Sequence, residues 1–331
     1  MKALVTGCSG FIGSEVLRGL TRRNIDVRAL LRKTSSRQNL KEVKYEEAIG
    51  DLQDFDSLLK AVEGVDYVFH LAGSIFARSK DEFFKHNAKG TSNLARACAE
   101  RNPNLKRFVY VSSLAASGPA SSDRPKTESE EVCPVSDYGL SKLEGEKELL
   151  KWAKDFSTSI VRPPVVYGPR DKGVLEFIKI VNAGFLPVFP SSNKKNEKLY
   201  SVIYVEDLVE AIIEAGLSLN QADHEIYHIS DNENHSWNEI LTSVSKVLNK
   251  KPITLKLPRF AWKGLASAYT VAGWALKKDF PLTLGKLKEL EQDYWICTNE
   301  KAKQKLGFHP KFDLKKGMET TVRWYKDNGW I

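Results

Sequence analysis

Short apolar runs and helical apolar patterns follow one another along the first half of the chain. The first run, residues 2–6, ends at a glycine and is typical of a buried parallel strand. From Phe11 onward, apolar residues recur at the spacing of a helix. Further strands are predicted at 27–31, 67–71, 108–111 and 159–161, and helices over 14–22, 55–62, 87–100 and 138–154. This alternation predicts an α/β fold with a doubly wound parallel sheet and right-handed crossovers.

Three glycines, Gly7, Gly10 and Gly13, occupy the turn between the first strand and the first helix. Inside a helix or strand each glycine costs up to about 1 kcal/mol relative to alanine. At this turn, however, the backbone bends sharply and approaches a ligand closely, while the helix N-terminal amides favour a phosphate. The GxxGxxG spacing therefore indicates a cradle for a dinucleotide pyrophosphate, and a tight turn without a ligand is the alternative.

The composition is that of a globular protein, with 42% hydrophobic and 28% charged residues in 331. No apolar run reaches the roughly 18–20 residues of a membrane span, and the N-terminus lacks the pattern of a signal peptide. The four cysteines are widely spaced and match no metal or redox motif. We therefore expect a reducing, cytoplasmic setting.

The net charge of +8 lies in the C-terminal third, where residues 241–331 carry 18 Lys/Arg against 8 Asp/Glu. A lysine-rich solvated face explains this excess, and an acidic ligand or an anionic membrane surface is the alternative. The six histidines show no ligand spacing. We expect no metal and no nucleic-acid partner.

The octapeptide TGCSGFIG at residues 6–13 resembles the TGxxGFIG signature of the extended short-chain dehydrogenase/reductase family. Other family motifs follow in order: GDL at 50–52, HLAG at 70–73, NAKGTSN at 87–93, SS at 112–113, YGLSK at 138–142, RPPVVYGP at 162–169 and VEDL at 205–208. The resemblance covers nearly the whole chain. It looks most similar to dihydroflavonol reductase-like, 3β-hydroxysteroid dehydrogenase-like and hopanoid-associated epimerase-like members.

The resemblance implies two domains and a homodimer. Residues 1–170 would form a Rossmann-type NAD(P)-binding domain, with sheet contributions from about 200–210 and 225–230. Residues 171–331 would form mainly a smaller α+β substrate domain. The helices at 87–100 and 138–154 would pair in the dimer.

The end of the second predicted strand indicates which nicotinamide cofactor is bound. An acidic residue there would bind the ribose hydroxyls of NAD, but this chain has Arg32 and Lys33. A guanidinium grips a 2′-phosphate, so we expect NADP(H) to be preferred, with NAD(H) possible. The residues expected to bind the cofactor are Gly7, Ser9, Gly10, Phe11, Ile12, Gly13, Arg32, Lys33, Asp51, Leu52, Leu71, Ala72, Gly73, Ser112, Tyr138, Lys142, Pro163 and Val166.

Tyr138 and Lys142 are four residues apart and share one face of a predicted helix. We expect the Lys142 ammonium and a charged nicotinamide ring to lower the pKa of Tyr138, so that Tyr138 exchanges a proton with a substrate oxygen. The resemblance implies that Lys142 also holds the nicotinamide ribose and that Ser113 binds the reacting oxygen. Ser112 and Ser113 could exchange roles. Asn87 is the family's fourth helper or is purely structural.

Two departures from the nucleotide-sugar members of the family bear on the substrate. Those members usually have Asn where this chain has Val165, and many have Arg near the position of Tyr200. Losing both would weaken diphosphate binding, although a lysine at 194, 195 or 198 could compensate. We therefore expect a reductase or dehydrogenase acting on a carbonyl or secondary alcohol of an apolar or cyclic small molecule. A nucleotide-sugar epimerase or dehydratase and a catalytically silent cofactor-binding protein are the alternatives.

Residues 258–278 combine helical apolar spacing with aromatic residues near both ends and flanking lysines. Such a helix either packs on the body of the protein or lies at a membrane interface. We therefore expect a packed helix, with peripheral membrane contact as the alternative.

Overall fold

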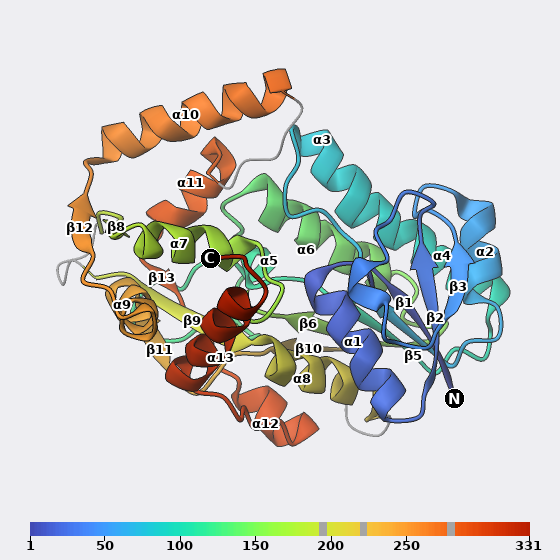
Figure 1. The fold of residues 1–331 in the computed structure, drawn as a ribbon. Coiled ribbons are helices and arrows are strands. Elements are labelled where there is room, and N and C mark those ends of the chain that lie inside the picture. The colour runs from blue at the N-terminus through green and yellow to red at the C-terminus, as the bar shows by residue number, and fades with distance from the viewer. Residues whose placement is uncertain (192–196, 219–223, 277–281) are drawn as a thin grey trace.

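The computed structural model describes residues 1–191, 197–218, 224–276 and 282–331, and of 274–276 only the backbone. Its larger part is a parallel sheet of seven strands in the order β10-β6-β5-β4-β1-β2-β3 (Figure 1). The strands are β1 (Lys2–Thr6), β2 (Asp26–Leu31), β3 (Glu46–Ile49), β4 (Tyr67–His70), β5 (Arg107–Val111), β6 (Ser157–Arg162) and β10 (Glu225–His228). This sheet confirms the predicted α/β fold.

Helices cover both faces of the sheet because its strands send apolar side chains to both sides. Ala3 and Val5 share a core with α1 and α8, whereas Leu4 faces α2 and α4. The covering helices are α1 (Phe11–Arg22), α2 (Phe55–Val62), α4 (Gly90–Arg101), α6 (Asp137–Leu150) and α8 (Val205–Leu217). Short helices between them are η1 (Gln38–Leu40), α3 (Lys80–Phe83), η2 (Phe84–Lys89) and α5 (Leu114–Ser117).

A second, smaller sheet joins four short strands around β9, with which β7, β11 and β13 pair. A separate two-stranded sheet pairs β8 with β12. The strands are β7 (Val165–Tyr167), β8 (Phe185–Val188), β9 (Leu199–Tyr204), β11 (Asn234–Ser236), β12 (Ile253–Lys256) and β13 (Tyr294–Trp295). The helices are α7 (Gly173–Asn182), α9 (Trp237–Leu248), α10 (Arg259–Leu276), α11 (Leu284–Glu291), α12 (Glu300–Leu306) and α13 (Leu314–Asp327).

The prediction that residues 200–210 extend the large sheet is wrong for the strand. Residues 200–204 belong to β9 in the smaller sheet, and only the following helix, α8, packs on the large one. The reason is visible in the side chains of β9. Tyr200, Val202 and Tyr204 enter the core of the smaller part, and Ile203 enters the core beneath the large sheet.

Two predicted helices differ in their bounds. The helix predicted over 87–100 begins as a π-helical segment, η2, which continues into α4. The helix predicted over 138–154 ends at Leu150, and residues 151–155 form turns. Within the described residues, no helix is both long and apolar enough to cross a bilayer.

Candidate active site

Backbone atoms pack closely around Gly7 and Gly13 in the turn after β1. Gly7 has φ +71°, and a Cβ there would lie 2.6 Å from the backbone nitrogen of Ala72. A Cβ on Gly13 would lie 2.2 Å from the carbonyl oxygen of Gly7. Gly10 differs because it is exposed and a Cβ would meet only the Gly7 carbonyl, at 3.2 Å.

Gly10 is also the N-cap of α1, which has no side-chain cap and no acidic residue in its first turn. The first amides of α1 are therefore available to an anionic group at an exposed position. Ser9, Phe11 and Ile12 are each half-buried around this turn. This arrangement fits a dinucleotide pyrophosphate.

Most of the predicted cofactor residues meet along one edge because they follow the carboxyl ends of parallel strands. Beyond the glycine turn after β1, they are Arg32 and Lys33 after β2, Asp51 and Leu52 after β3, Leu71, Ala72 and Gly73 after β4, Ser112 and Ser113 after β5, and Pro163 after β6. Asn93 of α4 binds the Leu52 carbonyl at 2.8 Å, which explains part of the NAKGTSN motif. Val166 lies apart from this edge, on β7 of the smaller sheet.

Arg32 and Lys33 are both exposed, and among the described residues neither side chain has an ion-pair partner. Arg37, which sequence reasoning missed, orders the loop that carries them. Its guanidinium donates to the carbonyls of Arg32 and Lys33, each at 3.2 Å, and pairs with Glu47 at 2.8 Å. The role of Arg37 depends on how the loop curls, which no spacing in the sequence indicates.

The catalytic tyrosine and lysine predicted from sequence stand one turn apart on α6. Ser136 caps this helix by accepting a hydrogen bond from the Gly139 amide at 3.1 Å. The Lys142 ammonium donates to the Val111 carbonyl at 2.7 Å and lies 4.3 Å from the centre of the Tyr110 ring. Burial lowers the pKa of Lys142 to about 7, with Glu146 acting in the opposite direction. Lys142 is thus held by the carboxyl end of β5.

Burial of the Tyr138 phenol acts against the lowering of its pKa that is predicted from Lys142 and a charged nicotinamide ring. It raises the pKa of Tyr138 to about 12, a hydrogen bond with Ser113 opposes this change, and the charge of Glu289 adds to it. The prediction counted the two positive charges and not the burial of the phenol. The ring of Phe83, 6.0 Å away between centroids, contributes to this apolar surrounding.

The structure distinguishes the two neighbouring serines. Ser113 caps α5, accepts a hydrogen bond from the Ala115 amide at 3.1 Å, and shares a side-chain hydrogen bond with Tyr138. Ser112 instead donates to the buried carboxylate of Glu146, which Arg162 holds at 2.6 Å. Ser113 is therefore the serine positioned beside the tyrosine.

Asn87 is fully buried within the π-helical segment η2, and both the oxygen and the nitrogen of its side-chain amide form hydrogen bonds. Its Oδ1 accepts from the Ser74 amide at 2.7 Å, and its Nδ2 donates to the Ser74 carbonyl and to Ser141 of α6, at 3.0 and 2.9 Å. A Cβ on Gly73 would lie 2.7 Å from Asn87 Oδ1 and 3.7 Å from Lys142 Nζ. Asn87 thus joins the loop after β4 to the catalytic helix.

Glu289 of α11 is a site residue that sequence reasoning missed. It is buried, accepts a hydrogen bond from the Ser136 hydroxyl at 2.6 Å, and pairs with Lys286 at 2.7 Å. It therefore joins a helix of the smaller part to the N-terminus of the catalytic helix. Glu289 lies 153 residues from Ser136 along the chain, and this separation gives no signal in a sequence.

This edge, with its glycine turn, a serine after β5 and a Tyr–Lys pair on α6, defines the class of extended short-chain dehydrogenases/reductases. The chain belongs to the NAD dependent epimerase/dehydratase family, whose model matches residues 3–230. Members of this class are enzymes, so the residues described above form a candidate active site rather than only a ligand cradle.

Individual relatives carry different activities. The chain is 30% identical to ceramide reductase from Caulobacter vibrioides, over 99% of this chain and 95% of that protein. It is 25% identical to UDP-glucose 4-epimerase from Vibrio cholerae, over 97% of this chain and 94% of that protein. The crystal structure of gox2253 superposes with a TM-score of 0.81 at 28% identity and covers 99% of both chains. The family therefore includes both reductases and nucleotide-sugar epimerases.

Proposed function

We propose that this protein is an NADP(H)-preferring reductase that converts a carbonyl group on an apolar or cyclic substrate into a secondary alcohol. The observation that carries this proposal is the state of Lys198, the described lysine that could replace the missing diphosphate anchors. Lys198 is buried, and its ammonium binds the carbonyls of Glu291 and Gln292, at 3.0 and 2.8 Å, and the carboxylate of Asp293 at 3.2 Å. Residues 194 and 195 lie outside the described residues.

The two positions that depart from the nucleotide-sugar pattern support the same proposal. Tyr200 is buried against Trp237, with 5.6 Å between the ring centroids, so it offers no cation to a diphosphate. Val165 is 43% exposed and has no polar group. A doubly charged diphosphate would lose several charge-assisted hydrogen bonds here. An uncharged apolar substrate does not need these hydrogen bonds.

The protonation state of Tyr138 suits reduction. With its pKa raised to about 12, the phenol keeps its proton at neutral pH and can donate it to a carbonyl oxygen. Ser113 donates a second hydrogen bond to the same oxygen and stabilises its developing negative charge. When bound, the nicotinamide supplies the hydride that the carbonyl carbon accepts. The alcohol then holds the hydride and the Tyr138 proton, and Tyr138 regains a proton from solvent.

Lys142 and Asn87 support this chemistry by position. Lys142, one helical turn from Tyr138, would in its protonated form favour the phenolate that forms after proton donation. Asn87 holds α6 through Ser141 and so fixes the orientation of Tyr138 and Lys142. Arg32 and Lys33, exposed at the end of β2, are the groups that would bind a 2′-phosphate.

The test is net oxidation of NADPH, followed at 340 nm, with a panel of aldehydes, cyclic ketones, steroid ketones and nucleotide-sugars. We expect turnover with an apolar ketone that falls by at least 100-fold in Tyr138→Phe, since general acid catalysis contributes about 10²–10⁴-fold. Tyr67→Phe, which removes a hydroxyl at the amino end of β4, away from the site, should keep full activity. Loss of activity in both variants would contradict the assigned role of Tyr138.

An epimerase is the second candidate, favoured by the match to the Vibrio cholerae enzyme. Conversion of a nucleotide-sugar to its epimer without a net change at 340 nm would overturn the proposed reductase. Tight cofactor binding with no reaction, unchanged in Tyr138→Phe, would indicate the silent binding protein instead.

A further inference from the structure

Helix α10 exposes an uncharged stripe where a surface helix normally carries charge. Trp262 and Ala266 form its buried face. The opposite side presents Phe260, Gly264, Ala268 and Val271, which are spaced four, four and three residues apart and are all exposed. Phe260 is 78% exposed and Val271 is 66% exposed. Phenylalanine and valine side chains are more often buried than exposed to this extent.

Strand β12, which precedes α10, adds a second apolar face. Ile253 is 70% exposed and pairs in register with Phe185 of β8, itself 46% exposed. Leu255 follows on the same face because side chains alternate along a strand. Three parts together are referred to as the α10–β12 surface: strand β12, its partner Phe185, and the exposed stripe of α10.

The charged residues of the surface itself are basic, and Glu291 of α11 lies beside Arg259 at its edge. Residues 240–278 contain eight Lys/Arg and no Asp/Glu. The described members in and beside the surface, Lys250, Lys251, Lys256, Arg259 and Lys263, are all exposed. Basic side chains beside protruding apolar ones complement the anionic head groups and the hydrocarbon boundary of a bilayer.

We propose that the α10–β12 surface docks this protein on an anionic lipid bilayer, with α10 lying in the interface rather than crossing it. A bilayer accommodates separate protruding side chains such as Ile253, Phe260 and Val271 without shape complementarity. A protein partner would instead need a continuous, closely fitting patch.

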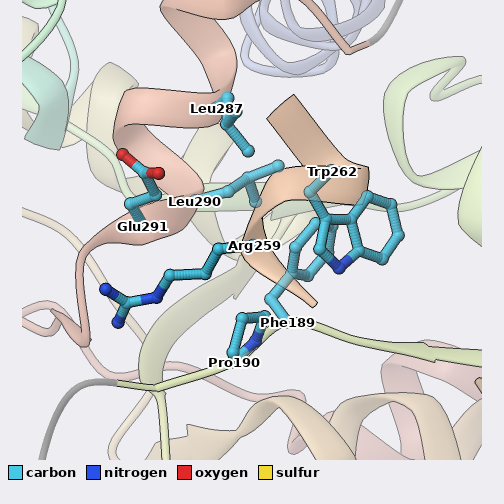
Figure 2. A pocket seen from close by; sticks show the side chains of 7 residues that line it. All are labelled: Phe189, Pro190, Arg259, Trp262, Leu287, Leu290 and Glu291. Atoms are coloured by element: carbon cyan, nitrogen blue, oxygen red, sulfur yellow. The ribbon is translucent and has the colours of Figure 1, made fainter. Parts of the chain in front are cut away.

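The same surface is joined to the candidate active site. Trp262 of α10 packs against Phe189 at 4.3 Å between ring centroids, and Figure 2 shows Leu287 and Leu290 of α11 beside them. From α11, Glu289 contacts the cap of the catalytic helix at Ser136. Docking therefore places α10 next to the bilayer, and α11, which packs against α10, links it to the candidate site. Docking itself does not rest on the proposed reduction.

The test is co-sedimentation of the full chain with vesicles of phosphatidylcholine alone or with 30 mol% phosphatidylglycerol, in 0.1 M NaCl. We expect binding only to the anionic vesicles, weakened at least tenfold in Phe260→Ser/Val271→Ser and again in Lys256→Gln/Lys263→Gln. Matched controls remove an exposed apolar residue and two exposed lysines elsewhere: Leu150→Ser and Lys147→Gln/Lys151→Gln. Thermal unfolding checks that each variant is folded.

Three outcomes would overturn the proposal. They are no binding to anionic vesicles, equal weakening in the control variants, and a dimer that becomes monomeric in Phe260→Ser/Val271→Ser. The last would assign the surface to a second copy of this chain. Because vesicle binding requires neither cofactor nor turnover, these outcomes are independent of the reductase test.

Discussion

Burial is the main cause of the pKa shifts of Tyr138 and Lys142, the proposed catalytic pair. It raises the pKa of Tyr138 to about 12 and lowers that of Lys142 to about 7, so both tend toward their neutral forms. The Tyr–Lys spacing could be recognised in the sequence. The directions of the pKa shifts could not, because they depend on what the helix packs against.

Replacing Glu289 by Gln tests its electrostatic role. Burial is the main cause of the raised pKa of Tyr138, and the Glu289 carboxylate adds to it. Removing that charge favours the phenolate, so the alkaline fall in kcat/KM for reduction should move to lower pH. The measurement is NADPH oxidation between pH 6 and 11. Glu291→Gln, an exposed position on the same helix, should leave the profile in place. A lower rate without a displaced profile would mean that Glu289 is only structural.

Arg32→Ala tests the preference for NADP(H). One charge-assisted hydrogen-bonding group is worth about 1.5–3 kcal/mol, or roughly 10–100-fold. We expect the Kd of NADPH to rise by that factor while the Kd of NADH changes little, both measured by titration calorimetry. Lys41→Ala, an exposed cation further along the chain, should affect neither. Equal weakening of both cofactors would show that Arg32 does not contact a 2′-phosphate.

At the scale of the elements, the glycines in the turn from β1 to α1 have two different roles. Gly13 permits close backbone packing, and Gly10 leaves room for a ligand. In Gly13→Ala the new Cβ would meet the Gly7 carbonyl at 2.2 Å, which is backbone and cannot move freely. We expect the free energy of unfolding to fall by at least about 1–3 kcal/mol in urea titrations. Gly10→Ala should change stability less and weaken cofactor binding more. The reverse order would place the ligand elsewhere.

Most elements of the large sheet could be predicted because their periodicity is local. Strand β5 and helix α2 are examples, since each has its apolar positions within a few residues. The π-helical start at Phe84–Lys89 could not be predicted, because it depends on Asn87 reaching both Ser74 and Ser141. Strand β9 was assigned to the wrong sheet because its two faces belong to different cores, and an apolar run does not reveal which partners it has.

At the scale of the whole molecule, two buried groups, His228 and Asp171, contribute to the pH dependence of stability in opposite directions. Burial lowers the pKa of His228 to about 3, from about 6.5 in an unfolded chain. Between these values the unfolded chain binds the extra proton, so stability is fully present above pH 6.5 and falls toward pH 3. His228→Asn should therefore lose less stability than the wild type between pH 7 and 5. A scanning calorimeter measures this difference.

Asp171 acts in the opposite direction. Burial raises its pKa to about 6, above the 3.8 of an unfolded chain. The native state therefore binds the extra proton between pH 6 and 3.8, and the contribution of Asp171 to stability grows as the pH falls. Asp171→Asn should consequently lose more stability than the wild type on acidification. The same pH slope in both variants and the wild type would contradict these assignments.

The candidate site as a whole was only partly predictable. Residues that follow successive strands could be placed together, because parallel strands end at one edge; Ser113 and Gly73 are examples. Glu289 and Arg37 could not, since the smaller part of the fold and the curl of one loop bring them there.

The central claim is net hydride transfer with Tyr138 as the proton donor. The most direct measurement is the fate of deuterium from NADPH labelled at the reactive C4 position, followed by mass spectrometry of product and cofactor. We expect one deuterium in the alcohol for each NADP⁺ formed, and a loss of at least roughly 100-fold in Tyr138→Phe. An epimerised product with the cofactor pool unchanged would contradict it.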